Sequence, residues 1–318
     1  MNEKPRLTIG LPVYNGESHL AEAIEALLGQ TFEDFELVIS DNASTDSTPD
    51  ICARYGRQDS RIRYIRQPHN IGLNPNHNFV VRQARGELFK MASHDDLYAR
   101  DLLKRCVEVL DEHPEVVLVH CWEAVIDTSG TVTKVLDYSV AADDPEATER
   151  FRSMLLDGWD DYTYGVMRTK VLHQTGLHRS HHLADRTINT ELALYGPFRM
   201  VPDWLYFRRD HPERKQPYTV RSRCAYLDPR RADRLRHPVA RLYGEYLLGY
   251  LTAIRSAPLT TAERNQCYRY LTRWLAGRVF PVFSRSLSGG ALQARRLEPR
   301  PRTDIKVDAL VAGREGRR

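Results

Sequence analysis

Two short apolar runs, each followed at once by a polar cluster, constrain the fold of this sequence more than any other feature. Residues 7–11 lead into Pro12-Val13-Tyr14-Asn15-Gly16-Glu17, and residues 35–40 lead into Asp41-Asn42-Ala43-Ser44-Thr45-Asp46. Short apolar runs bounded by turn-forming residues are typical of buried strands. Because ligands bind at the carboxyl ends of strands in open α/β sheets, the two clusters predict a nucleotide pocket at that edge.

Amphipathic helices alternate with further apolar runs through the first 120 residues. Leu20, Ile24, Leu27 and Leu28 place one apolar face on a helix after the first strand, and Ser47-Thr48-Pro49 favours the start of the next helix. Further strands are expected at 62–65, 87–91 and 116–120, with helices near 76–85 and 99–112. This alternation predicts an α/β fold with a mostly parallel, Rossmann-like sheet flanked by helices.

The pattern is looser in the second half. We expect a hairpin around 127–130, helices near 145–157 and 184–195, and a pair of strands at 164–167 and 198–201. From Pro238 the apolar residues repeat at helical spacing, and a second apolar helix follows Pro258. This predicts a C-terminal helical hairpin with a wide aromatic face. The face is expected to pack on the rest of the chain, with self-association or contact with a membrane-bound acceptor as alternatives.

Composition is that of a soluble globular protein: 42% of the 318 residues are hydrophobic and 28% charged. No stretch approaches the roughly 20 apolar residues of a membrane-spanning helix. The polar N-terminus lacks the apolar centre of a secretory signal, so a cytoplasmic location is expected by default. The five cysteines are widely spaced, without a C-x-x-C pair, which favours buried core residues over a disulfide framework or a zinc site.

The formal charge of +4 is concentrated at the C-terminus. Residues 286–318 contain eight Arg or Lys against four Asp or Glu, a net of +4, so the remaining chain is close to neutral. This tail has little apolar periodicity and is expected to be disordered. Contact with acidic lipid is one interpretation of its charge and simple solvation is another; we expect no nucleic-acid partner.

Two adjacent carboxylates, Asp95 and Asp96, follow the fourth apolar run in Met91-Ala92-Ser93-His94-Asp95-Asp96. Such a pair is tolerated when a divalent cation or the donors of a ligand lie between the two groups. Together with the two strand-end clusters, the segment resembles the GT-A glycosyltransferases of family 2. The resemblance is strong over residues 7–125, weaker over 160–211 and absent beyond about 230.

That resemblance implies a nucleoside-diphosphate sugar donor, Mg²⁺ or Mn²⁺ as cofactor, and inverting transfer of a sugar to an acceptor hydroxyl. The family usually has D-x-D-D where this chain has Ser93 at the first acid. Asp95 is therefore the expected metal ligand, Asp96 a second ligand or a ribose contact, and His94 a substitute contact. A structural pair that caps the following helix is the alternative.

Other family positions match as follows. Pro12, Val13, Tyr14 and Asn15 are expected to hold the base, with Glu17 beside them, and Asp41 to accept from the ring N–H of the base. Asn70 and Gly72 belong to a loop that walls the donor site. Arg209 is expected at the diphosphate, and His211 at the metal or the diphosphate. Asp41 alone is also compatible with a helix cap.

The base that accepts the proton of the acceptor hydroxyl is expected to be Asp185, in a helix where family members carry E-D. Ala184 stands in place of the glutamate. Because aspartate at a helix start is also a common cap, Glu191 and the pair Asp160-Asp161 remain alternatives. The absence of a Q-x-x-R-W motif favours the addition of one sugar per encounter.

The expected organisation is a catalytic domain at 1–228, a helical extension at 229–285 and the tail at 286–318. Residues 1–125 form the nucleotide-sugar-binding half and residues 126–228 the acceptor half. The acceptor is open between a glycan, a lipid-linked glycan and a small natural product, and a homodimer or peripheral membrane contact is conceivable. A sugar nucleotidyltransferase lacks its Gly-rich loop here and a dehydrogenase its G-x-G-x-x-G, while a non-catalytic sugar-nucleotide-binding protein stays open.

Overall fold

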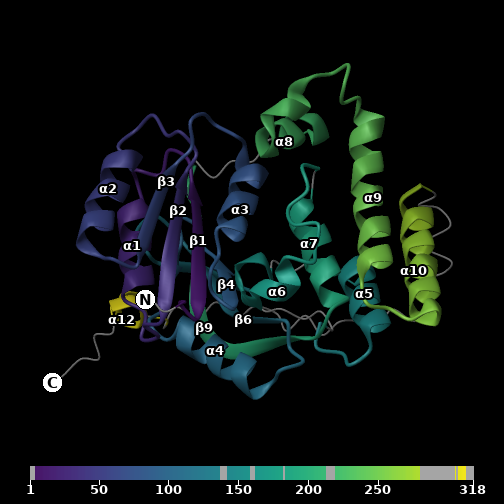
Figure 1. Ribbon diagram of the computed structural model, residues 1–318, viewed down its shortest axis with the longest axis horizontal. Helices are drawn as coiled ribbons and strands as arrows, with labels where there is room; N and C mark the ends of the chain where they lie inside the picture. Colours follow the sequence, from purple (N-terminus) through teal and green to yellow (C-terminus); the bar gives the residue numbers. More distant parts are fainter. Residues whose placement is uncertain are drawn as a thin grey trace.

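The computed structural model describes residues 4–136, 142–157, 162–181, 183–212, 219–279, 305 and 307–312. Within these ranges the core is a mixed nine-stranded sheet of order β3-β2-β1-β4-β8-β6-β9-β5, with β7 paired to β6 (Figure 1). The strands are β1 (Leu7–Val13), β2 (Phe35–Asp41), β3 (Ile62–Arg66), β4 (Leu88–Met91), β5 (Leu97–Tyr98), β6 (Leu118–Ile126), β7 (Val132–Leu136), β8 (Val166–Arg168) and β9 (Phe198–Arg209). The predicted fold class, a mostly parallel α/β sheet flanked by helices, is confirmed.

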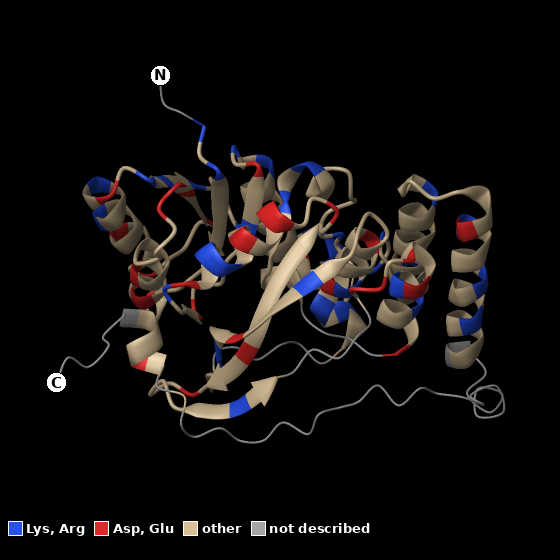
Figure 2. Cartoon of the chain, turned by 90° about the horizontal axis from the view of Figure 1, so that it is seen from below, with Lys and Arg blue, Asp and Glu red and all other residues tan. Residues whose placement is uncertain are grey.

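Helices connect and cover the strands. They are α1 (Leu20–Leu28), α2 (Thr48–Gln58), α3 (Leu73–Arg82), α4 (Leu102–Glu112), α5 (Ala147–Leu156), α6 (Thr169–Leu172), α7 (Ala184–Ala193), α8 (Val220–Leu227), α9 (Val239–Ser256), α10 (Thr261–Val279) and α12 (Val307–Ala312), with short 3-10 turns η1 (Tyr162–Tyr164) and η3 (Pro229–Ala232). Charged residues lie on helices, loops and some of the strands (Figure 2). Strand β1, at the middle of the parallel half, carries none, whereas β9 carries Arg199, Asp203, Arg208 and Arg209.

The first half of the sheet is parallel and carries its apolar side chains on both faces. Strand β1 pairs in register with β2 from Leu7 and Phe35 through Val13 and Asp41. On β2, Leu37 packs into the cluster beneath α1, α2 and α4, whereas Val38 packs into the cluster beneath α3 and α7. Because successive side chains point to opposite faces, one apolar strand serves two cores. The carboxyl ends of β1 and β2 therefore lie level at one edge of the sheet.

The absence of a side chain at Gly10 brings α3 close to β1. A Cβ atom at this position would lie 2.8 Å from Val80 of α3 and 2.7 Å from Phe89 of β4. Contacts this short do not occur between real side chains, so a larger residue would push α3 away from the sheet. The close packing matters for function because α3 begins at the edge where β1 and β2 end.

The predicted strands of the second half exist, but they do not pair with each other. Both flank β6, which joins β8 in antiparallel and β9 in parallel fashion. The strand expected at 198–201 extends to Arg209, and β5, α6 and α8 were not predicted. These strands are placed by pairing with distant parts of the chain, which local periodicity does not encode.

The predicted C-terminal hairpin is present as α9 and α10, and it packs on the rest of the chain. Tyr250 and Trp274 join a buried cluster with Phe151 of α5 and Leu194, which directly follows α7. The Phe151 and Tyr250 rings meet edge to face with centroids 6.5 Å apart. The aromatic stripe is therefore mostly core, although Val239 and Tyr243 at the start of α9 are exposed.

Part of the basic tail is ordered, contrary to expectation. Helix α12 buries Val307, and Val311 packs against the core beneath α1 and α4. The Arg100 amide donates to the Leu310 carbonyl at 3.0 Å. Two valines at i and i+4 give this short helix an apolar side, and the other residues of the tail, except Ile305, lie outside the described ranges.

Two further expectations concern the cysteines and membrane-spanning helices. All five cysteines are buried, as predicted for most of them, and none forms a disulfide. Among the described helices, none is both long and apolar enough to cross a membrane.

The hairpin packing predicts that two leucines of α9 and α10 respond differently to truncation. Leu271→Ala, at a residue 2% exposed, should lower the free energy of unfolding by about 2–5 kcal/mol because it leaves a cavity in the cluster shared with α5 and α7. Leu248→Ala, at a residue 57% exposed, is the control and should change it by less than about 0.5 kcal/mol. Urea unfolding measures both, and equal losses would contradict the packing.

Candidate active site

The loops after β1 and β2 are bonded to each other across the edge of the sheet. The Asn15 amide donates to Ser44 Oγ at 2.9 Å, and Asn15 Oδ1 accepts from the Thr45 amide at 2.9 Å. The Glu17 amide donates to Asp46 Oδ2, and Glu17 Oε2 accepts from the Ser47 amide, both at 3.0 Å. The two loops therefore form one rim.

Tyr14 stands on this rim with 44% of its surface exposed, while Pro12 and Val13 before it are buried in the strand. Of this predicted base-binding group, only Tyr14 offers an exposed ring. Pro12 and Val13 present backbone at the end of β1. The arrangement leaves a flat aromatic face available for stacking at the carboxyl edge.

Asp41 is completely buried and engaged within the protein. Its Oδ1 accepts from the Ser44 amide at 2.8 Å, and its Oδ2 accepts from the Tyr64 hydroxyl at 3.0 Å and lies 3.5 Å from Arg66 Nε. A contact with a nucleotide base requires exchange of one of these partners. Tyr64 and Arg66 were not among the predicted residues, because both lie within β3 and not in the polar segment that follows it.

Asn70 and Gly72 build the turn that starts α3. Asn70 Oδ1 accepts from Asn42 Nδ2 at 3.0 Å and from the Gly72 amide at 2.9 Å. Gly72 has a φ of +95°, and a Cβ there would lie 2.6 Å from Pro229 Cδ. Only glycine fits both conditions. The loop that is expected to line the donor site thus also packs against the corner between α8 and η3.

Asp95 faces His211 at the end of β9. His211 Nε2 lies 3.0 Å from Asp95 Oδ2, and Ser93 Oγ donates to Asp95 Oδ1 in a short hydrogen bond. Both side chains of the Asp95–His211 pair are 8% exposed. Ser93, the residue that departs from the family pattern, therefore holds the carboxylate where the family has a further acid. His94 packs against Gly16 of the rim.

Asp96 is turned into the protein. Its Oδ2 accepts a short hydrogen bond from the Tyr206 hydroxyl, and its Oδ1 accepts from the Arg209 amide at 2.9 Å. The exposed fraction of Asp96 is 0%. The two neighbouring carboxylates therefore have different surroundings, and Asp95 is the one beside an imidazole.

Arg209 is buried beneath this pair. Its Nε donates to the Asp95 carbonyl at 3.0 Å, and its Nη2 donates to Glu22 Oε2 on α1 at 2.6 Å. The guanidinium, predicted at the diphosphate, is thus engaged by α1 and the loop after β4. It lies beneath the carboxylate that faces His211.

His19, at the start of α1, was missed by the sequence analysis. Its ring meets that of His211 edge to face with centroids 5.2 Å apart. Burial lowers the pKa of His19, and the nearby charges of Arg209 and His211 act in the same direction. A histidine before the first helix carries no distinctive sequence signal.

Asp95 and His211 offer one carboxylate oxygen and one imidazole nitrogen to a cation. Among the described residues, no group of three or more His, Cys, Asp or Glu side chains is arranged to hold a metal. Two protein ligands still suit Mg²⁺ or Mn²⁺, which keep several waters and bind substrate phosphates. The separation of 3.0 Å between the two atoms is that of a hydrogen bond, which a bound cation would replace.

Asp185 lies in the first turn of α7 with 48% of its side chain exposed. The surrounding protein raises the pKa of its carboxyl to about 6 by desolvation, against the opposing charge of Arg223 on α8. His178 Nε2 is 3.5 Å from its Oδ1. Ala184, in place of the family glutamate, is buried. A half-exposed carboxylate with this pKa is deprotonated at neutral pH and can accept a proton.

The alternatives to Asp185 are placed differently. Glu191 is 2% exposed and accepts from the Gly176 amide at 3.1 Å, with Arg179 Nη2 at 3.8 Å. Asp160 and Asp161 lie outside the described residues. Of the candidates that the structure describes, Asp185 alone combines exposure with a place at a helix start.

Histidines connect the Asp95 loop to Asp185. Burial lowers the pKa of His77 on α3 to about 3, and the neighbouring His178 and His94 add to the effect. The rings of His77 and His178 have centroids 5.4 Å apart. His77 therefore contacts the ring beside Asp185, and the charge of His94 from the Asp95 loop also acts on its pKa.

Comparison with known families identifies the class of protein. Residues 8–184, more than half of the chain, match the model of glycosyl transferase family 2. The chain therefore belongs to that family, as the sequence predicted.

Known relatives match over a little more than a third of the chain. An uncharacterized glycosyltransferase of Rickettsia typhi is 32% identical over 124 residues, 39% of this chain and 38% of the relative. The glycosyltransferase GlyG of Streptococcus pneumoniae is 26% identical over 36% of this chain and 38% of its own length. The chain thus matches less than half the length of these relatives.

Solved structures show the same fold. S. aureus TarS 1–349, crystallised with UDP-GlcNAc, superposes with a TM-score of 0.62 at 19% identity, covering 90% of this chain and 76% of that one. The mannosyltransferase PcManGT of Pyrobaculum calidifontis, in complex with GDP-Man and Mn²⁺, gives 0.53 at 18% identity, covering 92% and 78%. At these identities the likeness establishes the GT-A-type fold alone.

The different surroundings of Asp95 and Asp96 predict different effects on stability. Asp96→Ala should lower the free energy of unfolding by about 3 kcal/mol, because the Tyr206 hydroxyl and the Arg209 amide lose their acceptor inside the protein. Asp95→Asn keeps the size and one acceptor oxygen, and should change it by less than about 1 kcal/mol. Urea unfolding measures the change in unfolding free energy in both variants. A larger loss in Asp95→Asn than in Asp96→Ala would contradict the different surroundings of the two carboxylates.

Proposed function

We propose that the protein transfers one sugar from a nucleoside-diphosphate sugar to an acceptor hydroxyl, with inversion at the anomeric carbon. The observation that carries the proposal is the position of Asp95. It faces His211 close to the rim formed by the β1 and β2 loops, at the carboxyl edge of a family 2 fold. Ligands of open α/β sheets bind at this edge.

Asp95 and His211 would hold Mg²⁺ or Mn²⁺. When bound, the cation offsets the negative charge that grows on the departing nucleoside diphosphate. Ser93 fixes the Asp95 carboxylate, and Asp96 and Arg209 fix the backbone on either side of the pair. The chain thus supplies a rigid pair of ligand atoms, with the donor phosphates expected to complete the coordination.

The donor would lie along the rim, with its base against Tyr14. In this position Asp41 meets the base only if Tyr64 or Arg66 moves away, so a base contact comes with a rearrangement of β3 side chains. TarS was crystallised with UDP-GlcNAc and PcManGT with GDP-Man. Uridine and guanosine diphosphates and these two sugar nucleotides are accordingly the first probes to use.

Asp185 would act as the general base. As the acceptor oxygen forms its bond to the anomeric carbon, the bond from that carbon to the diphosphate oxygen breaks, and the hydroxyl proton passes to the Asp185 carboxylate. A carboxyl pKa of about 6 leaves the base deprotonated at pH 7. Release of the free diphosphate from the sugar nucleotides, measured with and without added acceptor, separates an enzyme from an inert binding protein.

The metal assignment predicts a binding change in Asp95→Asn. Calorimetric titration with UDP or GDP should show binding that Mn²⁺ strengthens in the wild type, and the variant should lose at least about tenfold of that gain, since one charged ligand is removed. Asp203→Asn on β9, a half-exposed aspartate paired with Arg105, is the control. Equal Mn²⁺ dependence in wild type and Asp95→Asn would exclude Asp95 as a ligand.

The base assignment predicts a rate change in Asp185→Asn. The amide keeps the shape of the carboxyl without its basicity, so turnover should fall by about 10² to 10⁴ while affinity for the nucleoside diphosphate stays the same. In the wild type, turnover should also fall as the pH drops below about 6, where Asp185 becomes protonated. Turnover in Asp185→Asn within threefold of the wild type would refute the role.

A further inference from the structure

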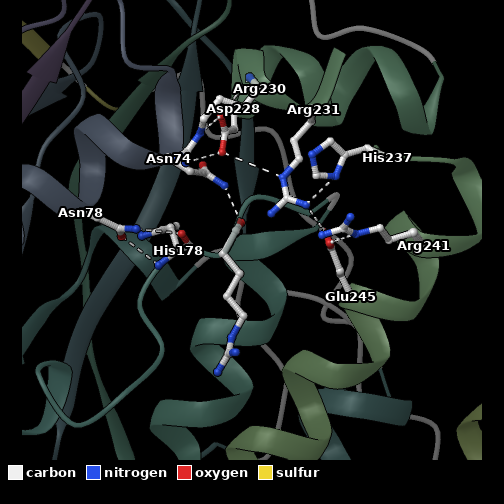
Figure 3. Close-up of polar contacts among 10 residues, drawn as sticks. Asn74, Asn78, His178, Asp228, Arg230, Arg231, His237, Arg241 and Glu245 are labelled. Carbon is white, nitrogen blue, oxygen red and sulfur yellow. Dashed lines mark hydrogen bonds and ion pairs between the residues drawn. The ribbon is translucent and has the colours of Figure 1, made fainter. Parts of the chain in front are cut away.

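His178 is fixed by two asparagines of α3, from the other half of the chain. Asn78 Nδ2 donates to the His178 carbonyl at 2.8 Å, and Asn78 Oδ1 accepts from the His178 amide at 2.9 Å (Figure 3). Asn74 Nδ2 donates to the Arg179 carbonyl at 2.7 Å. Three successive peptide units before α7 are thereby bonded to α3, so the backbone that carries the His178 ring has little freedom.

The ring of His178 points to Asp185. Its Nε2 lies 3.5 Å from Asp185 Oδ1, and the ring is 4% exposed. Within the described part of the chain, neither ring nitrogen of His178 has a hydrogen-bond partner at normal distance. A buried N–H without a partner is costly, and the Asp185 carboxylate, 3.5 Å away, lies just beyond a normal hydrogen-bonding distance. A movement of a few tenths of an ångström completes the bond.

The charges around the pair favour this bond. Burial lowers the pKa of His178 to about 4, so the ring is neutral at pH 7 and carries one N–H. His77 on α3 faces the ring, and Arg223 on α8 faces the carboxylate. A neutral donor beside Asp185 stabilises its charged form without adding a second positive charge to that of Arg223.

We propose that His178 is a positioning residue for Asp185, with its Nε2–H donated to the carboxylate and its place set by Asn78. The inference rests on the proposed role of Asp185 as base. Because α3 starts at the Asn70–Gly72 loop of the donor site, Asn78 also ties the position of the base to that of the donor. The proton of the acceptor still goes to Asp185, and His178 keeps its own.

The kinetic test compares His178→Leu with His178→Gln. Loss of the donor in His178→Leu should lower turnover at pH 7 at least about tenfold and move the acid limb of the rate profile up by about one pH unit. Gln offers an amide N–H near the position of Nε2, and should restore both. Affinity for UDP or GDP with Mn²⁺ should stay within threefold in either variant. A wild-type acid limb in His178→Leu would overturn the proposal.

The control is His120→Leu, which also replaces a buried, neutral histidine by leucine but lies on β6. It should leave the acid limb in place. Failure of the base assignment is seen separately, because Asp185→Asn then retains turnover. If Asp185→Asn is inactive while His178→Leu keeps the wild-type acid limb of the rate profile, the proposed function is retained and the positioning role of His178 is rejected.

A second measurement needs neither turnover nor a folded leucine variant. Side-chain ¹⁵N NMR of the full chain, assigned with His178→Gln, should show His178 neutral from pH 6 to 8 with its proton on Nε2. Its Nε2 signal should shift in Asp185→Asn. A proton on Nδ1, or an Nε2 signal that Asp185→Asn leaves unchanged, would overturn the proposal.

Discussion

The geometry of the site depends on the hydrogen bonds that the buried Asp96 carboxylate accepts. This carboxylate accepts from the Tyr206 hydroxyl and the Arg209 amide, and so fixes the turn after β4 to strand β9, more than 100 residues further along the chain. Arg209 then binds the Asp95 carbonyl and Glu22 of α1. Burial lowers the pKa of neighbouring Lys90 to about 8, opposed by the charge of Asp96. Asp95 and His211 face each other as a consequence.

A second set of polar contacts joins the two halves of the chain. Asn74 and Asn78 of α3 bind the backbone before α7, and Gly72 packs against Pro229. Helix α3 and the loop before it therefore contact both the segment that leads into α7 and the α8–η3 corner. Asp228 at that corner pairs with Arg230, and Arg231 pairs with Glu245 of α9 (Figure 3). The Asn70–Gly72 loop, the segment before α7, and helices α8 and α9 therefore share one polar framework, and a change in α3 is expected to reach all of them.

Sequence patterns predicted the parallel half of the sheet well, because its strands are short apolar runs and the polar residues at their ends directly follow these runs in the sequence. They identified Asp95, His211 and Asp185 as candidates, and the structure places each at an accessible edge or beside a possible partner. They favoured Asp95 over Asp96 as the metal ligand, but they did not predict that Asp96 is buried against β9. Tyr64 beside Asp41, His19 beside His211 and the ordered Val307 also depend on contacts across the fold, which no local spacing records.

The central claim is that Asp95 and His211 hold the cation that binds the donor phosphates. A crystal structure with Mn²⁺ and the tightest-binding nucleoside diphosphate, measured at the manganese absorption edge, tests it directly. We expect one anomalous peak from a Mn²⁺ ion bonded to an Asp95 carboxylate oxygen, to His211 Nε2 and to diphosphate oxygens. Asp96 should still be hydrogen-bonded to Tyr206 and Arg209. A nucleotide bound at the rim without a peak there, or with a peak on Asp96, would contradict it.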